Sequence, residues 1–424
     1  MNRRVFMKSG ALALVTMGLS PTFLRRSVFA AGLPRARQKG KTLICIFQRG
    51  AADALNVVVP HGEAAYYRMR PTIAIPRPSA GVDGAAIDLD GFFGLHPALA
   101  PFKPLWDRGL LTAVHAVGSP SNTRSHFDAQ DYMESGTPDD RNTPDGWLNR
   151  YLAARGTCAE CEVTPFRAVS MTPQTPRILE GASPVVAMND LDEFTIRTGG
   201  SAEAELEALY MTGSSDVVHA AGNDMFEAMK VLRAANPEQY QPRNGAEYPN
   251  TDFGRHMKQI AQLVKADVGL EIAFADVGGW DTHVNQGAST GQLAGRLTDF
   301  SRSIAALVAD LGDRMSDVAI LTMSEFGRTA RQNGNGGTDH GHAGAMFVIG
   351  GDVAGHKVHG RWPGLEPEQL NQDRDLALTT DFRSVFSEVV GKHLGATAFE
   401  RIFPNFPADR TRWAGVMAGE PASR

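Results

Sequence analysis

Short apolar runs recur along most of the chain. A run such as 42–47, in which nearly every position is apolar, is typical of a strand covered on both faces by helices in a parallel sheet. Comparable runs lie at 110–117, 167–171, 270–275, 318–323 and 346–350. The pattern predicts a largely buried strand in each of these segments.

Amphipathic segments separate several of these runs. In 293–311, hydrophobic side chains recur at steps of three and four and form a single stripe, which predicts a helix packed on a sheet. Further amphipathic segments are 202–210, 222–235, 253–264 and 383–394. Because strands and helices alternate broadly along the chain, the sequence predicts an α/β fold.

One part of the chain departs from this alternation. Segment 174–250 contains helical patterns but few strand-like runs, and it ends in the polar, proline-bearing stretch 236–250. We interpret it as an insertion or a helical cap within a single α/β domain that spans 31–424. Length alone would accommodate one large domain or two ordinary ones.

The first thirty residues have the pattern of an export signal. Arg3 and Arg4 precede a short, mildly apolar stretch, 11–19, and 28–30 ends in a small-x-small pattern that signal peptidase cleaves. The arginine pair, with Phe6 and Lys8 behind it, resembles a twin-arginine signal. We therefore predict export through the twin-arginine translocon to the periplasm or the cell exterior, with 1–30 removed. The apolar stretch is too short to be a stable membrane anchor.

Charge and cysteine content narrow the class of protein further. The first thirty residues carry five basic and no acidic side chains, so their removal changes the formal net charge from −5 to −10. An acidic surface without basic runs argues against binding to nucleic acid. Cys158 and Cys161 predict either a small local disulfide or two free thiols, and Cys45, the third cysteine, leaves no set of four for a structural zinc site.

Acidic residues and histidines follow several predicted strands, where ligands collect in an open parallel sheet. The segments are 48–53, 276–283, 324–328 and 338–342, and we expect them to converge. Candidate ligands in them are Asp53, Asp281, His283, Glu325, Asp339, His340 and His342.

Two pairs of these candidates share a spacing of two. In extended chain, Asp281 and His283 would point to the same side, as would His340 and His342, so that each pair could bind one cation. A mixed carboxylate and imidazole set suits zinc, manganese or iron better than calcium. The alternative is that these side chains bond to backbone groups in turns, as histidines and aspartates often do. Glycines around both pairs allow tight turns and close backbone approach.

A serine near a predicted helix start is the candidate nucleophile. Ser125 follows the second strand and would lie at the N-cap, where free backbone amides favour a bound anion. It would otherwise only cap the helix. Arg49, Arg124 and Arg328 are available to clamp an oxyanion, unless each is paired with a carboxylate.

Five motifs together resemble domain-of-unknown-function family 1501. They are Phe47-Gln48-Arg49-Gly50-Ala51-Ala52-Asp53, Arg124-Ser125-His126-Phe127-Asp128, Gly279-Trp280-Asp281-Thr282-His283, Ser324-Glu325-Phe326-Gly327-Arg328 and Gly337-Thr338-Asp339-His340-Gly341-His342. That family is similar to the alkaline phosphatase and sulfatase superfamily. The resemblance implies a doubly wound, mainly parallel sheet, one or two metal ions, and displacement at a phosphoryl or sulfuryl centre.

The resemblance also implies roles for individual residues. Asp53, Asp281, His283, Glu325 and either His340 or His342 would be metal ligands, and Ser125 would be the nucleophile. The chain departs from the superfamily pattern at Phe326, where a second imidazole is usual, so that either Asp339 and His340 replace it or only one metal binds.

The expected function is therefore metal-dependent hydrolysis of a phosphate or sulfate ester, on a small molecule or a glycan. Zinc or manganese would be the cofactor, with Ser125 as nucleophile and Arg328 stabilising charge on the transferred group. Two alternatives use the same scaffold: a catalytically silent binding or assembly protein, and a phosphoglycan transferase that passes the group to an acceptor other than water.

Overall fold

The fold is a mixed α/β sandwich built on one large sheet. The computed structural model describes residues 40–155, 164–191, 240–407 and 409–419. The predicted signal 1–30, Cys158, Cys161 and the helices expected at 202–210 and 222–235 lie outside these residues. No helix in the described part of the chain is long and apolar enough to cross a membrane.

The nine strands of the main sheet follow the order β11-β5-β10-β9-β1-β8-β6-β7, with β12 also paired to β5. Their bounds are β1 Thr42–Gln48, β5 Leu111–Gly118, β6 Ala168–Ser170, β7 Val186–Ala187, β8 Ile272–Val277, β9 Val318–Met323, β10 Gly344–Gly350, β11 Val358–His359 and β12 Thr380–Asp381. All six strands predicted from apolar runs are confirmed. A small antiparallel sheet consists of β2 Val58–Val59, β4 Gly94–Leu95 and β3 Ile87–Asp88.

Strand direction decides where the chain's polar segments meet. Every pair in the main sheet is parallel except those that β10 makes with β5 and β9. Because β10 alone runs in the opposite direction, its amino end lies at the same edge as the carboxyl ends of β1, β5, β8 and β9. The loop that leads into β10 therefore lies at the same edge of the sheet as the loops that follow these four strands.

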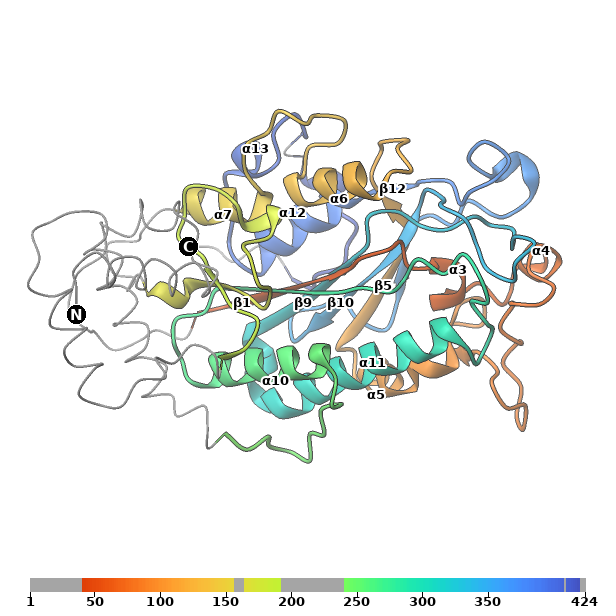
Figure 1. The fold of residues 1–424 in the computed structure, drawn as a ribbon, viewed down its shortest axis with the longest axis horizontal. Helices are drawn as coiled ribbons and strands as arrows, with labels where there is room; N and C mark the ends of the chain where they lie inside the picture. The colour runs from red at the N-terminus through yellow and green to blue at the C-terminus, as the bar shows by residue number, and fades with distance from the viewer. Residues whose placement is uncertain (1–39, 156–163, 192–239, 408, 420–424) are drawn as a thin grey trace, which may run out of the picture.

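Helices cover both faces of the sheet (Figure 1). On one face lie α5 Lys103–Asp107, α10 Asp252–Lys265 and α11 Gln292–Leu311, and on the other lie α6 His126–Ser135, α7 Trp147–Arg155, α12 Phe382–Lys392 and α13 Phe399–Ile402. The short helices α3 Ala54–Val57 and α4 Ala64–Met69 lie at one end. The helices predicted at 253–264, 293–311 and 383–394 are confirmed.

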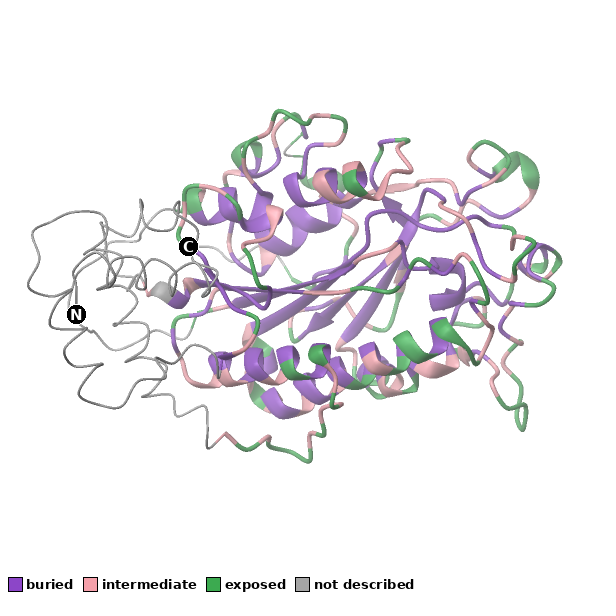
Figure 2. Cartoon of the chain, viewed as in Figure 1, coloured by how far each residue is buried: buried purple, intermediate pink, exposed green. Residues whose placement is uncertain are grey.

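Successive side chains along β1 point to opposite faces of the sheet and pack into two separate hydrophobic cores. Ile44 and Ile46 belong to the core that includes α10 and α11, whereas Leu43, Cys45 and Phe47 belong to the core on the other face. All are fully buried, as is the interior of the sheet generally (Figure 2). This two-faced burial explains why the strand is continuously apolar instead of alternating.

The described end of the predicted insertion is anchored to this framework. Asp310 of α11 is almost fully buried and accepts hydrogen bonds from the Tyr240 hydroxyl at 2.5 Å, the Tyr248 hydroxyl at 2.8 Å and the Arg243 amide at 2.7 Å. Lys265 of α10 pairs with the same carboxylate. Segment 240–248 therefore packs on α10 and α11. Within 174–191, β7 belongs to the main sheet, and residues 192–239 lie outside the described residues.

Candidate metal centre

Three histidines and an aspartate meet at the carboxyl edge of the sheet. His126 begins α6, Asp281 and His283 follow β8, and His340 lies in the loop that enters β10. The Nε2 atom of His340 lies 3.0 Å from Nε2 of His126 and 2.9 Å from Nε2 of His283. Asp281 Oδ1 lies 2.9 Å from Nε2 of His283.

Three of these four residues have the spacing of a metal site. His126, Asp281 and His340 each offer one ligand atom, and these three atoms lie within 4.8 Å of one another. Among the described residues, these three form the group of potential metal ligands that meets this spacing. His283 extends it through its short contacts with His340 and Asp281. We call His126, Asp281, His283 and His340 the His/Asp cluster.

Each histidine of the His/Asp cluster is held from behind by an acceptor. Nδ1 of His126 lies 2.8 Å from Glu325 Oε1, Nδ1 of His283 lies 3.0 Å from Asp339 Oδ1, and Nδ1 of His340 lies 2.9 Å from the Arg124 carbonyl. An ionised carboxylate or a carbonyl only accepts, so each Nδ1 carries the proton. Metal-bound histidines usually have such partners, which fix the tautomer and the ring orientation.

Because each Nδ1 carries the proton, the Nε2 atom on the opposite side of each ring has a free lone pair. In the neutral imidazoles, the three Nε2 atoms direct lone pairs at one another and at a carboxylate oxygen over about 3 Å. Like partial charges at that separation repel, and a cation between them converts the repulsion into coordination. The donor set of imidazole nitrogen and carboxylate oxygen fits zinc or manganese.

The surrounding charges favour a cation here. Burial raises the pKa of Glu325, but hydrogen bonds from His126, Gln130 and the Gly50 amide outweigh it and bring the pKa below its usual value. The bond to Glu325 raises the pKa of His126, and burial lowers that of His340. The carboxylate behind His126 thus stabilises positive charge, whether proton or metal, while His340 tends to stay neutral, as a ligand must.

Arg328 holds the aspartate of the cluster in place. Its Nη1 donates to Asp281 Oδ1 at 2.5 Å, and its remaining nitrogens donate to the side chain and carbonyl of Thr338. Arg328 is 1% exposed, and its Nε, Nη1 and Nη2 atoms all donate hydrogen bonds within the protein. Burial raises the pKa of Asp281, but Arg328 and the nearby histidines outweigh it and lower the pKa below the usual value.

The two other arginines predicted as clamps are also paired. Arg49 binds Asp276, Gln130 and Glu134, and Arg124 binds Asp375 and Gln372. All three arginines predicted as oxyanion clamps are therefore paired with carboxylates, which was the alternative to that role.

Ser125 is the N-cap of α6, as predicted. Its Oγ accepts from the Asp128 amide at a long 3.4 Å, and the residue is partly exposed. The helix ends at Gly136, whose φ of 70° is the left-handed conformation that favours glycine. Ser125 directly precedes His126 of the cluster in the sequence, and as an acceptor in the cap its hydroxyl retains its own proton to donate.

Four predicted ligands, Asp53, Glu325, Asp339 and His342, lie outside the cluster. Glu325 and Asp339 lie behind His126 and His283, as described above. Asp53 is fully buried and binds Arg70 through two hydrogen bonds of 2.6 and 2.9 Å, with Gln286 donating to it at 2.7 Å. The structure thus places Asp53 in a buried ion pair instead of the cluster.

His342 diverges from His340. The ring of His342 is buried, and its Nε2 donates to the Ser121 carbonyl at 3.1 Å. The predicted pairing of His340 with His342 needs an extended chain, whereas the backbone bends at His342. The Gly341 amide and the His342 carbonyl both bond back to Gly327, which holds this turn. A Cβ at Gly341 would lie 2.4 Å from the Arg328 carbonyl, so this approach requires glycine.

His126 is not among the ligands predicted from the sequence. It stands in the motif that drew attention to Ser125, and a histidine at the first position of a helix that follows a strand was the available signal. Its ring stacks on Phe326, with centroids 5.0 Å apart, and Phe326 also lies 5.2 Å from the His340 ring. Phe326 therefore packs against the rings of both His126 and His340.

An α/β fold with a His/Asp cluster at the carboxyl edge of its sheet defines a class of candidate metalloproteins. The chain belongs to the family described as "Protein of unknown function (DUF1501)", whose model matches residues 111–402. The match begins at β5 and includes all four cluster residues. None of the curated proteins with which the sequence was compared matches it.

Proposed function

We propose that the protein is an exported, metal-dependent hydrolase of phosphate or sulfate esters, with an alkaline-phosphatase-like arrangement of its doubly wound sheet. The observation that supports it most is the convergence of three imidazole Nε2 atoms on Asp281, each ring held at Nδ1 by an acceptor. Such a set suits one zinc or manganese ion at the edge of the sheet where ligands of open α/β sheets bind.

Individual residues have defined tasks in this proposal. His126, His340, His283 and Asp281 hold the ion, while Glu325, Asp339 and Arg328 orient them. A bound divalent cation supplies Lewis-acid polarisation and lowers the pKa of a nearby hydroxyl or water. The chain has Phe326 where the superfamily resemblance implies a second imidazole, which favours one ion over two.

Ser125 is the proposed nucleophile, and its substitution separates catalysis from capping. Ser125→Ala should abolish ester hydrolysis while leaving the metal bound, because Ser125 is not a ligand. Loss of the cap should cost about 1 kcal/mol of stability. Turnover, metal content and chemical denaturation measure the three effects. Ser125→Asp, which retains a capping oxygen, is the matched control for stability. Full turnover in Ser125→Ala would contradict the role of nucleophile.

Export belongs to the proposal and rests on residues 1–30. The arginine pair supports passage through the twin-arginine translocon to the periplasm or exterior, and that pathway suits a protein that acquires its metal while folding. A small-molecule or glycan ester is the proposed substrate.

A second candidate is a metal-containing protein without catalysis, which binds a partner or polysaccharide. The pairing of Arg49, Arg124 and Arg328 with carboxylates favours it, because none of the predicted clamps is left free for an oxyanion.

Metal analysis followed by a substrate screen tests both candidates. Protein purified without chelators should contain about one zinc or manganese per chain, measured by elemental analysis. Nitrophenyl phosphate, a bis-nitrophenyl diester and nitrophenyl sulfate should then distinguish a hydrolase from a silent protein, with the chelated and remetallated sample as control. Folded protein that binds neither metal would overturn both.

A further inference from the structure

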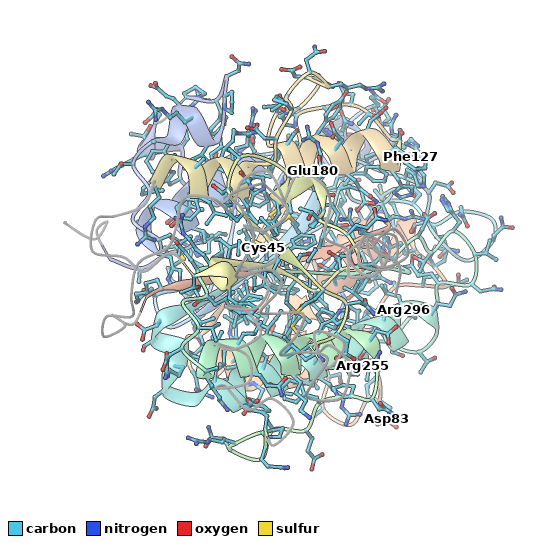
Figure 3. The ribbon with its side chains drawn as sticks, turned by 60° about the vertical axis from the view of Figure 1, so that its left-hand side comes forward. Cys45, Asp83, Phe127, Glu180, Arg255 and Arg296 are labelled. Atoms are coloured by element: carbon cyan, nitrogen blue, oxygen red, sulfur yellow. The ribbon has the colours of Figure 1, made fainter. Side chains whose placement is uncertain are left out.

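His283 is the most exposed histidine of the His/Asp cluster. Its side chain is 38% exposed, against 24% for His126 and 25% for His340. Figure 3 shows Phe127, next to His126, at the margin of the molecule beside α6, in contrast to Cys45 in the interior. Hydrophobic packing contributes little at such a surface position, so the His283 ring depends on hydrogen bonds for its orientation.

The glycine-rich loop 333–337 packs directly on the chain around His283. A Cβ at Gly337 would lie 2.4 Å from the His283 carbonyl, so this close approach requires glycine. Backbone hydrogen bonds of 2.9 to 3.2 Å join the two segments. They run from the Asn285 amide to the Asn335 carbonyl, from the Gln286 amide to the Gly336 carbonyl and from the Thr338 amide to the Thr282 carbonyl.

Asn333 begins this loop and uses every hydrogen-bonding position of its side chain. Its Oδ1 accepts from the Asn335 and Gly337 amides at 2.9 and 3.1 Å, which closes the loop. Its Nδ2 donates to the His283 carbonyl at 2.9 Å and to Asp339 Oδ1 at 3.1 Å. Backbone amides only donate, and carbonyl and carboxylate oxygens only accept, so the side-chain amide fits in this orientation alone.

Asp339 connects this amide to the His283 ring. Its Oδ1 accepts from Asn333 and also, at 3.0 Å, from Nδ1 of His283. Asn333 therefore holds His283 at two points, its backbone carbonyl and the carboxylate behind its ring. The Asp339 side chain is itself half exposed, so without the donor of Asn333 it gains freedom to turn toward water.

We propose that Asn333 is a positioning residue of the metal centre: it fixes Asp339 and the main chain of His283, and so directs the His283 Nε2 into the His/Asp cluster. The inference rests on the metal centre of the proposed function and adds the residue that preorganises its most exposed histidine. It does not depend on ester hydrolysis, so metal binding alone tests it.

Asn333→Asp tests this role with the smallest change in shape. Aspartate still accepts from the two loop amides, which retains the turn, but it presents an oxygen instead of Nδ2 to the His283 carbonyl and to Asp339. The affinity of the full-length protein for zinc, measured by competition with a chromophoric chelator, should fall about tenfold. The added negative charge alone would raise the affinity for a cation, so the direction of the change separates positioning from charge.

Asn335→Asp is the matched control. It makes the same substitution two residues away, at an exposed residue that takes part in the loop through its backbone. Its zinc affinity should stay within about twofold of the unaltered protein or rise slightly. In urea denaturation, Asn333→Asp and Asn335→Asp should be equally stable, because both retain the turn.

A double variant tests whether Asn333 acts through Asp339. If it does, Asn333→Asp combined with Asp339→Ala should bind zinc at most about twofold more weakly than Asp339→Ala alone. Fully multiplicative losses overturn the inference. So does unchanged or tighter binding by Asn333→Asp, an equal loss in Asn335→Asp, or a loss matched by a fall in urea stability, and in each case the metal centre still stands. If the unaltered protein binds no zinc, the metal centre is refuted and the inference with it.

Discussion

His340→Ala should release the metal, lowering its affinity by more than about 100-fold, and should abolish any ester hydrolysis. The expected loss of metal affinity is large because His340 Nε2 lies within 3.0 Å of Nε2 of both other cluster histidines. Loss of even an outer hydrogen-bond partner of a ligand commonly lowers metal affinity about 10–100-fold. Competition with a chromophoric chelator measures the affinity. His340 is preferred to Asp281 as the test, because Asp281→Ala would leave the buried Arg328 without its carboxylate.

The chain provides a matched control two residues away. His342 has the same side chain in the same loop, but its ring bonds to the Ser121 carbonyl. His342→Gln should therefore retain the metal with affinity within a few-fold of the unaltered protein. Equal loss of metal in both variants would contradict the proposed ligand set and restore the symmetrical His-x-His site.

An intermediate effect should identify the outer partners. Glu325→Gln removes the charge behind His126 but keeps an acceptor, and we expect a loss in affinity of about 10-fold. A loss as large as that of His340→Ala would instead make Glu325 a direct ligand, as the superfamily resemblance implies.

The sequence was most informative where burial on two faces dictates composition. β1 and β9 could be placed from apolar runs alone, because every side chain in them is buried. The reversed direction of β10 has no such signature, since a buried antiparallel strand between two neighbours is as apolar as a parallel one. That reversal nevertheless brings His340 to the site.

The site was predicted by segment better than by side chain. Residues after β8, after β9 and before β10 do meet, because strand direction fixes where each loop emerges. Which side chain turns inward depends on partners distant in sequence. Asp53 faces Arg70 and Gln286, and the bend at His342 depends on backbone bonds to Gly327, so neither outcome is visible in local spacing.

The buried pair of Asp53 and Arg70 gives the largest expected effect on stability. Both side chains are almost inaccessible, and Arg70 also donates to the carbonyls of Thr329 and Ala330, which lie between β9 and the loop of His340. Asp53→Ala should lower the free energy of unfolding by about 3–5 kcal/mol, because it leaves a guanidinium buried without its counter-charge. Urea denaturation of the protein provides the measurement.

Removing both charges should cost less than removing one. The double variant Asp53→Leu with Arg70→Met replaces the pair by hydrophobic side chains of similar size, which commonly restores much of the loss. Asp53→Asn, the mildest change, should keep its metal, since the carboxylate of Asp53 is occupied by Arg70 and Gln286. If Asp53→Asn loses metal as completely as His340→Ala while remaining folded, Asp53 is a ligand and the proposed ligand set is wrong.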